Sequence, residues 1–107
     1  MENVFLNTIP TQLGLLTNLR ALYLQKNRLT VEWQLPTELG LLTALEVLDL
    51  SDNALTGLLP TELGLLTSLK VLDVSNNFLS GRIPREIWKL QTNHSLEEFG
   101  FANNYFF

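Results

Sequence analysis

The chain has 107 residues, with no cysteine, one histidine and seven basic residues that never cluster. The absence of cysteine excludes disulfides, thiolate metal sites and cysteine nucleophiles, and a single histidine cannot form a two-histidine metal site. Dispersed positive charge and a net charge of -4 disfavour binding to nucleic-acid phosphates. We therefore expect no metal, no cofactor and no nucleic-acid partner.

Long hydrophobic runs are also missing. No apolar run reaches the roughly 18 residues that span a membrane, and the first ten residues, MENVFLNTIP, lack the basic start and long apolar core of a signal peptide. Attachment to a membrane would require a segment of a longer parent protein. With 46% hydrophobic and 17% charged residues, the composition is that of one folded domain.

A repeat dominates the sequence. The octapeptide PTELGLLT occurs at 36–43 and at 60–67, and the four prolines of the chain share one register. In this register the apolar residues follow the frame LxxLxxLxxLxLxxNxL. Such periodicity predicts a solenoid with one coil per repeat. The predicted units are a partial repeat at 1–9 and four repeats at 10–35, 36–59, 60–83 and 84–107.

The frame also predicts local structure. In LxL the apolar and polar residues alternate, which is the period of a short strand. Proline suits the first position of a helix, so a short helix or 3₁₀ turn is expected through each TELGLL, where the glycines allow close packing or a tight turn. The asparagine of each coil is expected to pair with backbone groups in a buried ladder. The four ladder residues are Asn27, Asn53, Asn77 and Asn104.

This frame is the periodicity of a leucine-rich repeat, and the segments TGLLP at 56–60 and SGRIP at 80–84 resemble the LxGxIP ending of the plant-type class. The resemblance covers nearly the whole chain. It implies an α/β leucine-rich-repeat solenoid: a right-handed curved coil with short parallel β-strands on the concave face and short helical or 3₁₀ turns on the convex face.

The resemblance also implies a role. In receptor-like kinases, receptor-like proteins and polygalacturonase inhibitors of this class, the repeats are extracellular recognition domains. The chain would then be a non-catalytic recognition module in the extracellular or cell-surface part of a longer protein. The rival hypothesis is a structural or intracellular scaffold whose repeats only space other domains.

The outward strand positions form the predicted binding surface. They build an open platform, which suits a protein, a peptide or an oligosaccharide better than a small metabolite. Tyr23 and Lys26 depart from the aspartate and asparagine of the other coils, either by drift or because they form a contact with an aromatic anchor. The predicted ligand-binding residues are Arg20, Tyr23, Gln25, Lys26, Glu46, Asp49, Ser51, Asp52, Lys70, Asp73, Ser75 and Asn76.

Catalytic patterns are nearly absent. Asp49 and Asp73 on adjacent strands would lie about 4.8 Å apart, near the carboxylate separation of retaining glycosidases, but an open sheet face offers no pocket for a sugar. No kinase motif and no glycine-rich phosphate loop occur. We expect no enzyme activity in this chain, and a catalytic domain would lie elsewhere in a parent protein.

Positions outside the frame carry further expectations. The second leucine of GLLT, at Leu15, Leu41 and Leu65, is expected to pack partly under the convex turn, with an exposed stripe for lateral association as the alternative. Trp33, beside a two-residue insertion, is expected to cover the widened coil or to project as a contact. Three extra residues in the last repeat place the glycosylation triplet Asn93-His94-Ser95 on a surface loop.

The two ends lack the polar cap that a solenoid needs. We therefore interpret the chain as a fragment of a longer array, with a small complete protein as the alternative. Apolar surface at such ends favours self-association. The residues expected to expose it are Val4, Phe5 and Leu6 at one end and Phe101, Tyr105, Phe106 and Phe107 at the other.

Overall fold

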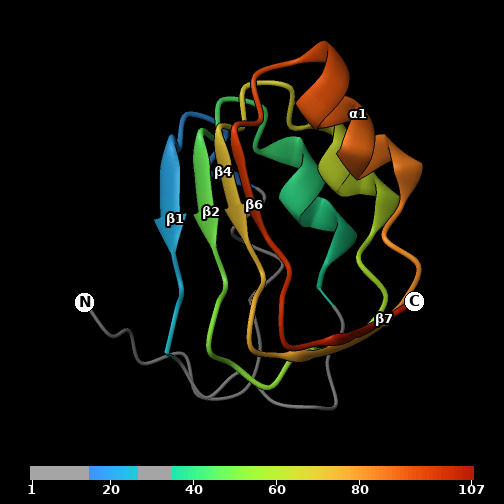
Figure 1. Ribbon diagram of the computed structural model, residues 1–107. Helices are drawn as coiled ribbons and strands as arrows, with labels where there is room; N and C mark the ends of the chain where they lie inside the picture. Colours follow the sequence, from blue (N-terminus) through green and yellow to red (C-terminus); the bar gives the residue numbers. More distant parts are fainter. Residues whose placement is uncertain (1–14, 27–34) are drawn as a thin grey trace.

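The structure is a computed structural model that describes residues 15–26 and 35–107. Its main sheet has four parallel strands in the order β1-β2-β4-β6. These strands lie side by side, and the helical turns of the chain cover the opposite side (Figure 1). The strands are β1 (Ala21–Tyr23), β2 (Val47–Asp49), β4 (Val71–Asp73) and β6 (Glu98–Gly100).

Each helical turn begins directly after a proline. The turns are the 3₁₀ helices η2 (Thr37–Leu41) and η3 (Thr61–Leu65) and the α-helix α1 (Arg85–Asn93). Pro36 and Pro60 have ψ angles of 138° and 139°, so each is the extended residue before the helix. The sequence had placed proline at the first helical position, and the structure corrects this by one residue. The proline carbonyls still accept the first hydrogen bonds, as in Leu39 N to Pro36 O at 3.2 Å.

A second parallel sheet lies along the lower edge of the coils, with the order β3-β5-β7. Its strands are β3 (Thr56–Gly57), β5 (Phe78–Gly81) and β7 (Tyr105–Phe106). This sheet was not predicted, although it occupies the LxGxIP part of the repeat. Gly57 and Gly81 have φ angles of +80° and +76°, which favour glycine over residues with a Cβ.

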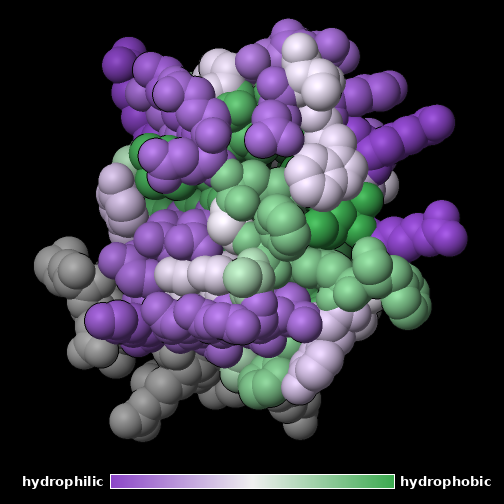
Figure 2. Space-filling model, viewed as in Figure 1, coloured by the Kyte–Doolittle hydropathy of each residue, from purple (hydrophilic) through white to green (hydrophobic). Residues whose placement is uncertain are grey.

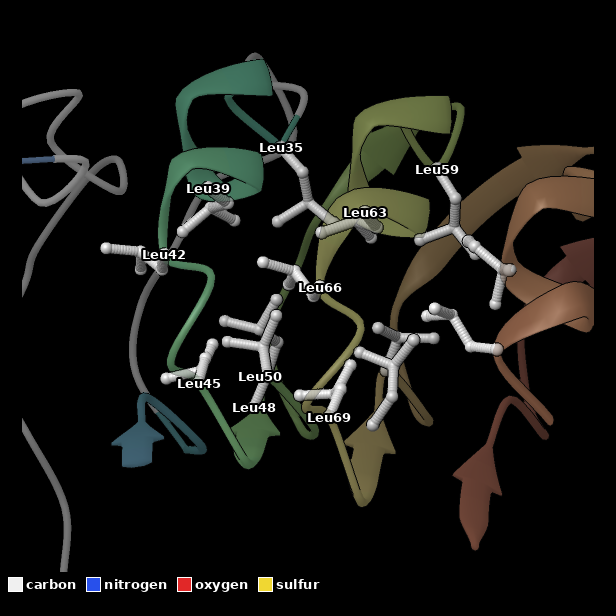
Figure 3. Packing of buried hydrophobic residues seen from close by; sticks show 14 of the residues in the cluster. Leu35, Leu39, Leu42, Leu45, Leu48, Leu50, Leu59, Leu63, Leu66 and Leu69 are labelled. Atoms are coloured by element: carbon white, nitrogen blue, oxygen red, sulfur yellow. The ribbon is translucent and has the colours of Figure 1, made fainter. Parts of the chain in front are cut away.

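The core lies between the main sheet and the helical turns. Leucines of equivalent position in successive coils point into this space and pack against one another (Figure 3). Leu42, Leu48 and Leu66 are completely inaccessible to solvent. Burial of such side chains stabilises the fold by about 1.5–3 kcal/mol each. The leucine frame read from the sequence is therefore the hydrophobic core.

The predicted asparagine ladder is present in the described coils. Asn77 is 4% exposed, and its Nδ2 donates to the carbonyl oxygens of Leu50, Val74 and Ser75 at 3.0, 3.0 and 3.1 Å. Its Oδ1 accepts from the Leu55 backbone N–H at 3.1 Å. The amide therefore joins its own coil to the preceding one. Asn53 and Asn104 donate to backbone carbonyls in the same way.

The prediction for the second leucine of GLLT is wrong. Leu15, Leu41 and Leu65 have exposed fractions of 78%, 54% and 57%. They point outward because Leu39 and Leu42, on the other side of the same turn, already fill the core. The exposed stripe that the sequence left as the alternative is what the structure shows.

The apolar side chains predicted to be exposed at the C-terminal end lie within the described residues. At the C-terminal end Phe101, Tyr105 and Phe107 are exposed as expected, whereas Phe106 packs partly against the core. Other predictions concern residues outside the described ranges. These residues are Val4, Phe5, Leu6, Asn27 and Trp33.

Candidate recognition surface

The outward side chains of the main sheet form one continuous surface, which we call the strand face. Parallel pairing aligns Tyr23 with Asp49, Asp49 with Asp73, and Asp73 with Gly100. A second row of the strand face consists of Ala21, Val47, Val71 and Glu98. The row before the strands consists of Arg20, Glu46, Lys70 and Glu97, whose backbones are also hydrogen-bonded from coil to coil.

Two aspartates on the strand face are held by serines of their own coils. Oδ1 of Asp49 accepts from the backbone N–H and the hydroxyl of Ser51 at 3.0 and 2.7 Å. Asp73 accepts from Ser75 at 3.0 and 2.6 Å. These bonds fix the orientation of each carboxylate. Within the described parts of the chain no donor reaches Oδ2, so this oxygen can accept from a ligand.

The same bonds correct one predicted site residue. Ser51 was expected to point outward, but it is 7% exposed and its hydroxyl is directed to Asp49. Ser75 is half-buried with the same bond to Asp73. Both serines therefore orient a neighbour instead of offering a free surface hydroxyl.

The residues just after the strands form a turn, with backbone in the left-handed region. Lys26, Asp52 and Asn76 have φ angles of 56°, 57° and 58°. Nδ2 of Asn76 donates to Asp52 Oδ1 at 2.7 Å, and Nδ2 of Asn103 donates to Asn76 Oδ1 at 2.7 Å. These polar side chains are a second, exposed ladder along one border of the strand face.

The predicted site residues lie on one side of the molecule but differ in access. Tyr23 is 50% exposed and is the large aromatic side chain of the first described strand. The exposed members are Arg20, Tyr23, Lys26, Asp52, Lys70 and Asn76, and the half-buried members are Gln25, Glu46, Asp49, Asp73 and Ser75.

Charge is unevenly distributed over the strand face. The β1 side carries Arg20 and Lys26, whereas the β6 side carries the exposed Glu97 and Glu98. The two glutamates were not among the predicted site residues. In the repeat, Glu97 is at the position equivalent to Arg20, and Glu98 is at the position equivalent to Ala21. This equivalence was the sequence signal that could have identified them. The face therefore changes from basic and aromatic at one end to acidic at the other.

This arrangement offers hydrogen-bond acceptors, charges and an aromatic ring on an open sheet. Within residues 15–26 and 35–107, no group of three or more His, Cys, Asp or Glu could hold a metal ion. Over the same residues, no helix has the length and apolar character needed to cross a membrane. Gly100 lies beside the Asp73 carboxylate, and a Cβ at this position would lie only 2.6 Å from Asp73 Oδ1. The absence of a side chain at Gly100 therefore leaves the space that the carboxylate occupies.

The glycosylation triplet lies away from the strands, at the end of α1. Asn93 is the last residue of the helix and His94 follows it with extended backbone. Asn93 is exposed. The extra residues of the last repeat therefore lengthen a helix, where a surface loop was predicted, and the asparagine remains accessible.

Residues 43–84 match a family model described as leucine-rich repeats in two copies. No curated protein sequence matches the chain. Many solved structures resemble it over almost its full length, including the following three, which have TM-scores of 0.80 or more.

The PEPR1–AtPEP1 structure is 40% identical over 98% of the chain, with a TM-score of 0.88. The Arabidopsis receptor kinase HAESA, in complex with the peptide hormone IDA and the co-receptor SERK1, is 33% identical over 94%, with a TM-score of 0.85. A plant ice-binding protein is 30% identical over 94%, with a TM-score of 0.80. The chain spans 15%, 16% and 31% of these three proteins, respectively.

Proposed function

Since the chain is a leucine-rich-repeat solenoid with repeats of the plant type, we propose that it is a non-catalytic recognition module that binds a protein or peptide ligand. The observation that carries the proposal is the strand face, where oriented aspartates lie beside an exposed tyrosine. The similarity to a receptor kinase in complex with a peptide hormone supports a ligand of this class. The role of the parent protein is proposed to be that of a receptor-like or secreted protein.

The proposed contact region is centred between Tyr23 and Asp73. A tyrosine ring provides a rigid contact at low entropic cost, and each aspartate offers Oδ2 for a charge-assisted hydrogen bond. The acidic β6 side favours a basic ligand segment, whereas Arg20 and Lys26 favour an acidic one over β1. An extended peptide that crosses the strands can place an acidic segment over β1 and a basic segment over β6.

The test is to capture peptides from a plant extracellular extract on the immobilised chain and to measure the affinity of each captured peptide, made synthetically, by calorimetry. Tyr23→Ala and Asp73→Lys are each expected to weaken binding at least about tenfold, since truncated hot-spot contacts cost 2 kcal/mol or more. Leu41→Ala, on the opposite side, is the control and should leave the affinity unchanged.

Other outcomes would favour different interpretations. A peptide whose affinity ignores both strand-face changes but falls with Leu41→Ala would place the site on the turn side. Failure to capture any peptide that depends on the strand face would favour the scaffold hypothesis.

An extracellular or cell-surface location is part of the same proposal, because the structures that the chain resembles include the leucine-rich-repeat ectodomain of a plant membrane receptor kinase. Exposure of Asn93 makes the triplet a usable acceptor. When the chain is expressed behind a secretion signal in plant cells, we expect a glycan that is removed by a glycosidase and lost in Asn93→Gln. A secreted chain without that mass shift would show that the triplet is not used.

A further inference from the structure

Stacking of the coils depends on a column of glycines in the helical turns. A Cβ at Gly40 in η2 would lie 2.7 Å from the carbonyl oxygen of Glu62 in η3. A Cβ at Gly64 in η3 would lie 2.6 Å from the Cβ of Glu86 in α1. Since real Cβ atoms avoid such distances, each glycine provides the space into which the backbone of the next turn packs.

In the last coil this column contains tryptophan. Trp88 in α1 is the equivalent of Gly40 and Gly64 in the repeat register. Its ring packs edge-on against Phe99 and Phe101, with centroid distances of 5.3 and 5.8 Å, and these two rings lie 5.1 Å apart. Edge-to-face pairs of this kind are favourable beyond their buried area.

The two phenylalanines occupy core positions of the repeat. Phe99 pairs with Leu72 of β4, which is completely buried by the stacked coils. Phe101 is 42% exposed and Trp88 is 37% exposed. Figure 2 looks onto this end of the array and shows hydrophobic side chains gathered between β6 and α1, with hydrophilic residues around them. The indole ring therefore covers part of the core that an ordinary coil would leave open.

We infer that Trp88 is a closing residue of the array: it replaces the glycine needed for stacking and shields Phe99 and Phe101 in place of a following coil. A coil added in the geometry of the others could not approach α1 as closely as η3 approaches η2. Close stacking of an ordinary coil on α1 is thus disfavoured, and this limits the self-association predicted from the sequence.

The first test compares Trp88→Ala with Lys89→Ala, the neighbouring exposed position of the same helix. Both replacements introduce alanine, which favours helix, but only the first removes the aromatic cover. Trp88→Ala should raise the unfolding equilibrium constant in urea by about tenfold or more and should increase the binding of a hydrophobic dye. Trp88→Phe should recover much of the loss. Equal unfolding midpoints for the two alanine variants would overturn the inference.

The second test extends the full chain after Phe107 by a copy of residues 81–83 followed by a copy of residues 60–83. In stacked arrays an added coil normally raises both the urea midpoint and the dependence of unfolding on urea, because it forms a new interface. We expect neither increase. An increase in both would show that the end accepts an ordinary coil, and the inference would then be wrong.

Discussion

At the scale of single residues, Lys26 is the poorest match between side chain and backbone. Its φ angle of 56° lies in the left-handed region, where the equivalent positions carry Asp52, Asn76 and Asn103. Aspartate and asparagine tolerate this region, whereas it costs other residues about 1 kcal/mol or more. Lys26→Asn should therefore raise the free energy of unfolding by about 0.5–1 kcal/mol, measured by urea denaturation.

A matched control separates backbone from charge. Lys70→Asn removes the same charge at an exposed position whose φ is not positive, so it should give no gain. If both variants gain equally, loss of positive charge would be the cause and the backbone argument would fail.

The ladder residue Asn77 is the second case at this scale. Its removal leaves the Leu55 N–H without its hydrogen-bond partner, whereas the carbonyls of Leu50, Val74 and Ser75 each lose one of two donors. Because a buried group left unsatisfied costs about 1–3 kcal/mol, Asn77→Ala should destabilise by about 1–3 kcal/mol. Asn93→Ala, at an exposed position, should cost less than about 0.5 kcal/mol. Similar thermal midpoints for the two variants would remove the ladder as a source of stability.

At the scale of elements, successive helical turns pack closely because Gly64 has a hydrogen atom where any other residue has a Cβ. Gly64→Ala would place a methyl group 2.6 Å from the Glu86 Cβ, and relief of this overlap should cost about 1–3 kcal/mol. Leu65→Ala alters the next residue of η3, which is 57% exposed, and should cost about 0.5 kcal/mol or less. Urea unfolding of the pair is the measurement, and a neutral Gly64→Ala would show that the turns can move apart freely.

The elements also show how far the sequence could predict the fold. Repeat register was sufficient for the main sheet, the core leucines and the asparagine ladder, because equivalent positions in stacked coils must meet. The same alternation failed at Ser51, since the strand ends at Asp49 and the chain then bends toward the left-handed Asp52. Which face of the turn Leu41 occupies depends on how Leu39 and Leu42 fill the core, and periodicity alone does not contain that information.

The candidate site was predictable in outline for the same reason. Register placed Tyr23, Asp49 and Asp73 in one row, and the pairing of the strands confirms that row. The hydrogen bonds from Ser51 and Ser75 that orient the carboxylates depend on side-chain rotamers, which no repeat pattern specifies. The second sheet was missed because its strands lie in the LxGxIP part of the repeat, outside the LxL alternation that identified the strands of the main sheet.

At the scale of the whole molecule, the backbones of the described elements lie closest to the equivalent elements of adjacent coils: η2 to η3, η3 to α1, and each strand to the next strand of its sheet. The free energy of unfolding is then approximately the sum of one contribution from each coil and one from each interface between adjacent coils. A change in one coil can affect a distant coil only through the interfaces between them. How strongly the coils are coupled is therefore measurable with a probe at one end and a mutation away from it.

Trp88 provides the probe, since Trp33→Phe leaves it as the single tryptophan of the chain. Leu48 lies in β2 and is completely buried, so Leu48→Ala should cost about 2–5 kcal/mol. If the interfaces couple the coils into one cooperative unit, Trp88 emission and far-ultraviolet circular dichroism should report the same lowered urea midpoint. A Trp88 midpoint that stays unchanged while the dichroism midpoint falls would mean that the last coil unfolds independently of β2.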